Sequence, residues 1–386
     1  MRLLPGARHF EVTELPTYDP AGSGEHLYAW IEKEGLDSEQ VVESLSRATG
    51  RPARDIGYAG RKDRVAITRQ WFSIRLADEA ALQRVTAETG GRISVLEISR
   101  DREKLRLGQL RGNRFRLGVD PGGDPRAPDS LRAGLERLTQ FGVENRFGPQ
   151  RFGSFGANVA IARAWGSGDT SRAAALCVDP SGTWTLGEPL PTGYVPGPAG
   201  RVLGALRRAP DDPAGALRAA GPRFAKLIAS AAQSTVFNAV LDARRAAGLL
   251  YTLRAGDVAR RRSGGVFRCL PDDLAGSNAR AAPGTLEILA TGPLPGFEMH
   301  APSPAIADEE LGFSAAAEID WGLFAAGGPL ASPGDRRALV VPFLERPEVE
   351  AAGETVWLRF ALPAGSYATE VLTQLGVRVA AQDRTG

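Results

Sequence analysis

The chain has 386 residues, long enough for two domains of ordinary size or for one domain that carries a large insertion. Its hydrophobic fraction of 43% and charged fraction of 24% are typical of a soluble globular protein, and its net charge of +2 argues against a uniformly basic polyanion binder. No run approaches the ~18 apolar residues of a membrane helix, and the N-terminus lacks the apolar core of a signal peptide. We therefore expect a cytoplasmic protein with no membrane partner.

Cysteine and histidine are too sparse and scattered to predict a disulfide framework or a metal site. Cys177 and Cys269 stand far apart, and so do the three histidines. We expect no metal and no other cofactor. Any catalysis would then depend on carboxylates, amides, hydroxyls and cations.

The first part of the chain has the pattern of mixed α and β structure. A helix is expected over 36–49, with Asp37 as its N-cap and Gly50 at its end. Strands are expected over 66–76 and 93–99. The stretch 105–119 alternates most clearly, because Phe115, Leu117 and Val119 fall on one face while Arg114 and Arg116 fall on the other.

The second part of the chain alternates between loop-rich stretches and predicted elements. A helix is expected over 130–140, and a long helix over 223–247. Residues 179–200, 263–285 and 291–304 are rich in Gly and Pro and predict loops. Strands are expected over 337–343 and 355–361, followed by a short helix from about Glu370. Candidates for the buried face of the long helix are Leu227, Ala231, Val236, Val240 and Leu241.

Charge is distributed unevenly along this chain. Residues 51–116 carry 16 Lys or Arg against 8 Asp or Glu, and residues 201–262 carry 12 against 4. Residues 298–354 reverse this balance, with 3 basic and 11 acidic side chains. The two basic regions could face one polyanionic ligand, or each could be an ordinary solvated surface.

The block 57–73, which reads GYAGRKDRVAITRQWFS, is the most informative segment. Its single carboxylate, Asp63, is surrounded in sequence by Arg61, Lys62, Arg64 and Arg69. Nearby positive charge lowers the pKa of a carboxyl group, and the same cations can bind a polyanion. The pattern indicates chemistry on a nucleic acid, although a single Asp is more often part of a surface ion pair or a turn.

This block resembles the signature of the TruD family of tRNA pseudouridine synthases, Gly-x-Lys-Asp-x-x-Ala-x-Thr-x-Gln. Three later segments, KLRLGQLRGNRF at 104–115, NRFGPQRFG at 145–153 and LPAGSYAT at 362–369, are similar to other TruD segments, and so is the helix around 232–238. One such motif could arise by chance, but four in the same order could not. Together they span nearly the whole chain. The signature matches at Gly60, Lys62, Asp63, Ala66, Thr68 and Gln70.

The resemblance implies an α+β fold, a pseudouridine synthase catalytic core with a mixed sheet and flanking helices, interrupted by a TRUD insertion domain. The core would comprise residues 1–150 plus 336–386, and the insertion residues 151–335. The RNA would bind in the cleft between them. The expected activity is isomerisation of a flipped-out uridine to pseudouridine at position 13 of tRNA, with tRNA or another structured RNA as partner and no obligate protein partner.

The resemblance also implies roles for individual residues. Asp63 would be the catalytic nucleophile or base, attacking either the sugar or the uracil. Phe10, Asn113 and Tyr367 match substrate contacts of the family, and Phe115 lies two residues beyond Asn113 on the same strand face. On residue type alone, a place in the core is the more common role for these three aromatic side chains. Candidates for RNA phosphate contacts are Arg61, Lys62, Arg64, Arg111, Arg114 and Arg151.

One feature departs from the family pattern. Relatives carry a basic residue shortly before a PEDF-like stretch, as a partner for the catalytic aspartate. Here the segment is MRLLPGARHFEVTE, with Leu4 at the ungapped position, so Arg2 or Arg8 would have to substitute.

Two other classes of function stay open: an RNA-binding folding factor, and aspartate-based phosphoryl transfer. The second needs further acidic side chains to bind Mg²⁺, and none occurs near Asp63 in the sequence.

Overall fold

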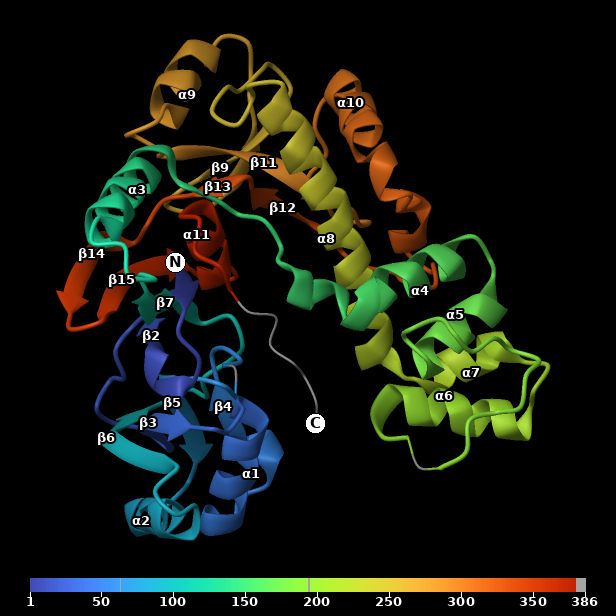
Figure 1. Ribbon diagram of the computed structural model, residues 1–386. Coiled ribbons are helices and arrows are strands. Elements are labelled where there is room, and N and C mark those ends of the chain that lie inside the picture. The colour runs from blue at the N-terminus through green and yellow to red at the C-terminus, as the bar shows by residue number, and fades with distance from the viewer. Residues whose placement is uncertain (63, 194, 380–386) are drawn as a thin grey trace. The chain divides into compact units, whose positions relative to one another are not determined.

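A computed structural model describes residues 1–62, 64–193 and 195–379, and the chain divides into two compact units. The first unit comprises Met1–Val143 and the chain from Val341 onward, and the second comprises Glu144–Val340. Both units combine helices with strands (Figure 1), which confirms the predicted α+β class.

The first unit is built on a mixed nine-stranded sheet, counted over the described residues. Its strands are β1 (Arg2–Leu3), β2 (Phe10–Pro16), β3 (His26–Glu34), β4 (Ile56–Tyr58), β5 (Ile67–Arg75), β6 (Ile93–Asp101), β7 (Leu110–Asp120), β14 (Glu345–Ala352) and β15 (Thr355–Pro363). Neighbours follow the order β14-β15-β7-β2-β5-β3-β6, while β1 pairs with β7 and β4 with β5. Strands β2 and β5 are parallel, and the other pairs are antiparallel.

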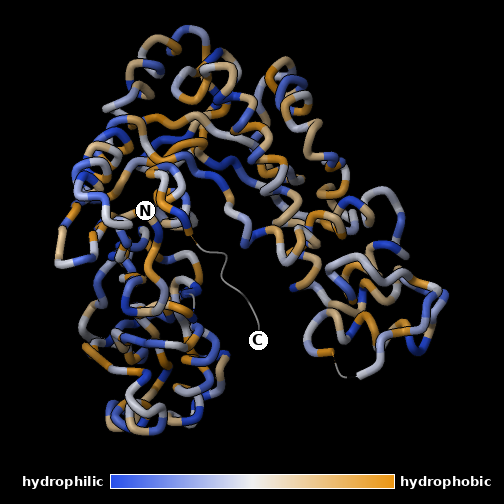
Figure 2. The backbone as a smooth tube through the Cα atoms, in the orientation of Figure 1, coloured by the Kyte–Doolittle hydropathy of each residue, from blue (hydrophilic) through white to orange (hydrophobic). Residues whose placement is uncertain are grey.

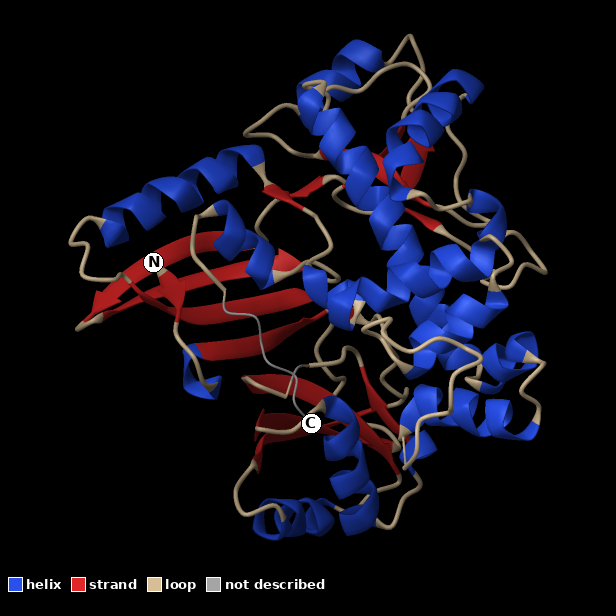
Figure 3. Ribbon diagram, turned by 45° about the vertical axis from the view of Figure 1, so that its right-hand side comes forward, coloured by secondary structure: helices blue, strands red, loops and turns tan. Residues whose placement is uncertain are grey.

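Helices α1 (Ser38–Thr49), α2 (Glu79–Glu88), α3 (Ala127–Phe141) and α11 (Ala368–Gln374) accompany this sheet (Figure 3). The predicted start and end of α1 are confirmed, because the Asp37 side chain accepts a hydrogen bond from the Gln40 backbone and Gly50 adopts a left-handed conformation with φ 67°. Apolar side chains of α1 and α2 pack against β3, β5 and β6 in one cluster. This packing fixes the start of α1 beside the centre of the sheet.

The second unit contains helices around a smaller sheet. The helices are α4 (Ala157–Gly166), α5 (Thr170–Val178), α6 (Gly197–Arg208), α7 (Pro213–Ala219), α8 (Pro222–Ala246), α9 (Leu274–Ala281) and α10 (Pro304–Ser314). The sheet has the order β10-β9-β11-β12, from β9 (Val258–Arg261), β10 (Val266–Arg268), β11 (Ile288–Leu294) and β12 (Asp335–Ala338). Two short strands, β8 (Val143–Glu144) and β13 (Val340–Val341), form a separate pair.

Helix α8 is the central element of the second unit, and its bounds match the predicted 223–247 within one residue. Ala231, Val236, Val240 and Leu241 are buried as predicted, but the prediction for Leu227 is wrong, because its side chain is 44% exposed. Both hydrophobic and hydrophilic residues occur along the helix (Figure 2). By length and composition α8 could cross a membrane, but 61% of its most apolar window is buried inside the protein, as in a core helix of a soluble protein.

Several other predicted elements differ from the structure in type or in bounds. The loop-rich stretch 263–285 contains β10 and α9, and the stretch 291–304 begins inside β11, because tertiary packing overrides the local Gly and Pro signals. The single strand predicted over 337–343 is two short strands, β12 and β13. The strand predicted from residue 105 begins at Leu110, and the final helix begins at Ala368.

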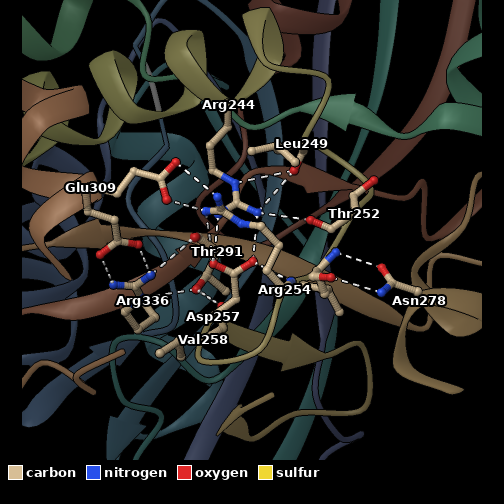
Figure 4. Close-up of polar contacts among 12 residues, drawn as sticks. Arg244, Leu249, Thr252, Arg254, Asp257, Val258, Asn278, Thr291, Glu309 and Arg336 are labelled. Carbon is tan, nitrogen blue, oxygen red and sulfur yellow. Dashed lines mark hydrogen bonds and ion pairs between the residues drawn. The ribbon is translucent and has the colours of Figure 1, made fainter. Parts of the chain in front are cut away.

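A buried charge network connects α8 to the small sheet (Figure 4). Arg244 binds both carboxylate oxygens of Asp257, at 3.0 and 3.1 Å, and both side chains are almost fully buried. The Arg244 guanidinium also donates to the backbone oxygens of Leu249 and Thr252. Since every partner is satisfied, the pair tolerates burial that would otherwise be costly.

We expect Arg244→Met to lower the free energy of unfolding by about 3–5 kcal/mol, because it leaves the buried Asp257 carboxylate without its cation. Urea denaturation measures this change. The matched control is Arg280→Met, since Arg280 pairs with Glu287 at 2.8 Å with both side chains about half exposed. Its loss should be below about 1 kcal/mol. Equal losses in the two variants would contradict a structural role for the buried pair.

Candidate active site

The segment Gly60–Lys62 connects β4 towards β5 and directly precedes Asp63. Asp63 itself lies outside the residues that the structure describes, so the site is described from the residues around it. Three groups of contacts surround this segment: a buried ion pair, a chain of side-chain hydrogen bonds, and the facing surface of β7.

Lys62 is buried and forms an ion pair with Glu14 on β2. The distance from Lys62 Nζ to Glu14 Oε2 is 3.0 Å, and the side chains are 3% and 1% exposed. Glu14 Oε1 accepts a longer hydrogen bond from the Trp71 backbone, at 3.4 Å. Burial raises the pKa of the Glu14 carboxyl above its ordinary value, although the Lys62 charge opposes this shift. The Lys62 ammonium therefore points into the protein, which conflicts with its predicted contact to an RNA phosphate.

Side-chain hydrogen bonds fix the backbone of the same segment. The Lys62 backbone N–H donates to Ser38 Oγ at 3.0 Å, and Ser38 Oγ donates to Gln70 Oε1 at 3.1 Å. Gln70 Nε2 in turn donates to the Gly60 carbonyl at 2.9 Å. A side chain at position 60 would place its Cβ 3.1 Å from Lys62 Nζ and 3.3 Å from Leu110 Cδ1. The glycine thus leaves room for the lysine to fold back onto Glu14.

Asn113 lies directly opposite Glu14 in the pairing of β2 with β7. Its Oδ1 atom is buried and has no hydrogen-bond partner among the described residues. A buried amide oxygen without a partner costs free energy in the unliganded protein. The register thus places an unpaired acceptor beside the buried Glu14–Lys62 pair.

Aromatic rings continue from Asn113 along the same face. Phe10 contacts Phe115 edge to face, with ring centroids 6.5 Å apart, and Phe115 packs against Phe360 at 5.6 Å. Phe115 is a core side chain with 7% exposure, whereas Phe10 is half-buried. Tyr367, also half-buried, is the N-cap residue of α11 and follows the end of β15, where Leu362 pairs with Asn113.

The arginines predicted to contact RNA phosphates do not form one cluster in the structure. Arg61 and Arg64 are exposed; Arg61 pairs with Glu39 at 3.0 Å, and Arg64 donates to the Gly35 carbonyl at 3.2 Å. Arg111 is exposed at the start of β7, beside the turn that begins at Ala364.

The remaining two candidates, Arg114 and Arg151, have contacts of a different kind. Arg114 lies on the face of β7 opposite Asn113 and binds both oxygens of Glu345, at 2.7 and 2.6 Å. Arg151 belongs to the second unit, where its guanidinium lies 5.2 Å from the centroid of the Phe147 ring.

Comparison with known proteins identifies the family. The family model of tRNA pseudouridine synthase D (TruD) matches residues 1–182 and 200–375. The chain belongs to the TruD family.

Named relatives agree with this assignment. The tRNA pseudouridine synthase D of Geobacter sulfurreducens is 38% identical over 95% of this chain and 91% of its own length. That of Thermus thermophilus is 34% identical over 95% of this chain and 86% of its own length. A crystal structure described as the putative TruD of Methanosarcina mazei matches the fold with a TM-score of 0.70 at 24% identity, covering 97% of this chain and 94% of that one.

The two candidates for the basic partner of the TruD aspartate, Arg2 and Arg8, lie at or before the first strands of the sheet. Arg2 pairs with Asp120 at 2.8 Å, and β1 joins β7 at Val119 and Asp120. This position is seven residues from Asn113 along β7, a separation of about 23 Å at 3.3 Å per residue. Arg8 is exposed in a short helical turn just before β2, whose first residue pairs with Leu117. Arg2 is thus paired elsewhere, and because Asp63 lies outside the described residues, the identity of its basic partner stays a prediction.

Sequence reasoning missed the roles of Glu14 and Ser38 in this TruD site. The sequence did contain a signal for Glu14. In the strand, Val12 and Glu14 occupy alternate positions on the same face, and both are buried, so the acid falls on the core-facing side. Ser38 gave no separate signal, because a serine at the start of a helix is ordinary. In the part of the chain that the structure describes, no group of three or more His, Cys, Asp or Glu side chains is placed to hold a metal ion.

We expect Lys62→Met to lower the free energy of unfolding by about 3–5 kcal/mol at pH 8, because Glu14 would be buried without its cation. Losing the cation raises the Glu14 pKa further. A carboxyl with a raised folded-state pKa destabilises the fold as pH rises above its unfolded pKa, so the loss should shrink towards pH 5. Denaturation at both pH values measures the effect.

Two further variants test the explanation. The double variant Glu14→Gln/Lys62→Met should lose less stability at pH 8 than Lys62→Met alone, because it buries no charge. The neighbouring variant Arg61→Met, which removes an exposed pair, should lose below about 1 kcal/mol. If the cost of Lys62→Met matched that of Arg61→Met, the buried pair would not stabilise the segment.

Proposed function

We propose that this protein isomerises a uridine of tRNA to pseudouridine, at position 13, with Asp63 as the catalytic nucleophile or base. The observation that carries the proposal is membership of the TruD family across almost the whole chain. The reaction breaks the bond between N1 of uracil and C1′ of the ribose, turns the base and joins C5 to C1′, while C5 loses its proton and N1 gains one. It is an isomerisation, so its balance requires no oxidant or reductant.

The contacts of Lys62 support a role for Asp63 in which its carboxylate does not pair with the neighbouring Lys62 ammonium. Lys62 Nζ is 3.0 Å from Glu14, so its charge is already neutralised inside the protein. The Lys62 N–H donates to Ser38 Oγ and Gln70 Nε2 donates to the Gly60 carbonyl, so the backbone is held at Gly60 and Lys62. A rigid segment directly before a catalytic carboxylate reduces the cost of bringing that carboxylate to the substrate.

The face of β7 supports a pocket for the flipped uracil. Asn113 Oδ1 can accept a hydrogen bond from the N3–H group of the base, and this contact would satisfy a buried atom that has no other partner among the described residues. Phe10 offers a half-buried ring for stacking, backed by Phe115, and Tyr367 adds a hydroxyl at the nearby turn. Stacking and hydrogen bonding would repay the few kcal/mol needed to unstack the base.

We further propose that the first unit is the catalytic core and the second the TRUD insertion domain, in a cytoplasmic enzyme. Arg61, Arg64 and Arg111 are exposed and fit contacts to RNA phosphates. Arg114 and Lys62 fit less well, because each is bound to a carboxylate. Arg151 stays a candidate in the second unit.

We expect Asp63→Asn to abolish pseudouridine formation while leaving tRNA affinity within about threefold, because the amide keeps the size of the side chain but lacks a carboxylate nucleophile or base. Pseudouridine is mapped in the tRNA by chemical modification and primer extension, and the dissociation constant is measured by filter binding. Product formed at the wild-type rate by Asp63→Asn would disprove the mechanism. A wild-type protein that binds tRNA without modifying it would favour an RNA-folding factor.

We also expect the logarithm of the tRNA binding constant to fall linearly with the logarithm of salt concentration, as counterion release requires. Arg111→Gln should weaken binding and reduce the slope by about one, because one phosphate contact is lost. Arg280→Gln, on an exposed pair of the second unit, serves as the control and should leave the slope unchanged. A wild-type binding constant that does not change with salt concentration would exclude electrostatic binding of the RNA backbone.

A further inference from the structure

Phe155 is held in a backbone conformation that disfavours its side chain. It has φ 55° and ψ 17°, in the left-handed region where residues with a Cβ atom are strained. Its side chain is 83% exposed, the highest value among the exposed large hydrophobic residues of the described chain. The ring therefore gains little from burial that would compensate for the strain.

The turn around Phe155 is well supported and does not itself require a phenylalanine. Gly153 and Gly156 also have positive φ angles, 76° and 70°, and the Gly156 N–H donates to the Gly153 carbonyl at 3.2 Å. Asn158 Nδ2 donates to the Arg151 carbonyl at 3.4 Å, and α4 begins at Ala157. A glycine at 155 would follow the same path without strain. Neither local folding nor core packing thus accounts for the ring.

All the charged residues in the segment around the ring are arginines. Residues 145–168 contain Arg146, Arg151 and Arg163 and no Asp or Glu. Two of these arginines pair with acids from other segments, Arg146 with Asp242 and Arg163 with Glu318. An exposed aromatic ring on a fixed support can stack on an unpaired base, because every base has a π-face. An apolar protein partner would instead require a contiguous apolar patch.

We propose that Phe155 is a stacking platform for an unpaired base of the RNA substrate. This inference rests on the proposed function, since tRNA supplies the base. It assigns to the second unit an RNA contact that is independent of the uracil pocket and of phosphate binding. The free-energy cost of the strained backbone is then offset in the complex, where the ring stacks on a base.

The test compares Phe155→Gly with Phe155→Trp. Phe155→Gly relieves the strain, so its melting temperature should rise by about 2 °C. The same variant should bind unmodified tRNA about tenfold more weakly, a change of about 1.4 kcal/mol, with an unchanged salt slope because no phosphate contact is lost. Phe155→Trp keeps an aromatic face and should bind within about twofold of the wild type.

Leu76→Gly is the matched control. Leu76 also combines a positive φ angle, 48°, with an exposed apolar side chain, 53% exposed, but it lies in the first unit directly after β5. We expect it to gain stability in the same way as Phe155→Gly and to bind tRNA as the wild type does. A loss of stability in Phe155→Gly, tRNA binding by that variant at wild-type affinity, or equal weakening in Leu76→Gly would each overturn the inference.

The proposed function is tested separately in the same assays. If the wild type forms no pseudouridine in tRNA, the proposed function fails whatever the Phe155 variants do. If the wild type is active and Phe155→Gly retains both full affinity and full kcat/KM, only the stacking platform fails.

Discussion

The buried ion pair between Glu14 and Lys62 is the constraint on which the site depends. It joins the central strand β2 to the segment before Asp63, and both charges are removed from water. Such a pair is stable only while both partners are present, because either charge alone would be buried without compensation. The strand order, the glycine at 60 and the hydrogen bonds of Ser38 all accommodate this contact. The chemistry proposed for Asp63 would therefore depend on packing in the middle of the sheet.

The second unit uses buried charge in a comparable way. Arg336 on β12 binds both oxygens of Glu310 on α10, and both side chains are at most 2% exposed. Arg336 also contacts Thr291 of β11, and Arg254 binds Glu309 nearby (Figure 4). Bidentate arginine–carboxylate pairs have strict geometry, so they specify which helix packs on which strand more precisely than apolar contacts do.

Elements that depend on local chemistry could be predicted from the sequence. The N-cap at Asp37 and the alternation of Phe115, Leu117 and Val119 follow from contacts within a few residues or along one strand. The exposure of Leu227 could not be predicted, because helical periodicity does not say which neighbouring element covers each side of a helix. The family motifs located the site at Lys62 and Asn113, but not the partner of Lys62. Glu14 is 48 residues away in sequence, and only the parallel pairing of β2 with β5 brings them together.

The Oδ1 atom of Asn113, which has no hydrogen-bond partner among the described residues, has a consequence for base selection. The atom is buried, so the cost of removing it from bulk water is incurred when the protein folds, and a donor group of a ligand would offset that cost. Uracil presents N3–H to such an acceptor, whereas cytosine presents a lone pair at N3, which would repel it. With the proposed contact, the pocket would reject cytidine at the recognition step, by leaving two acceptors facing each other. Discrimination between the two pyrimidines would then be built into the resting enzyme before any bond is broken.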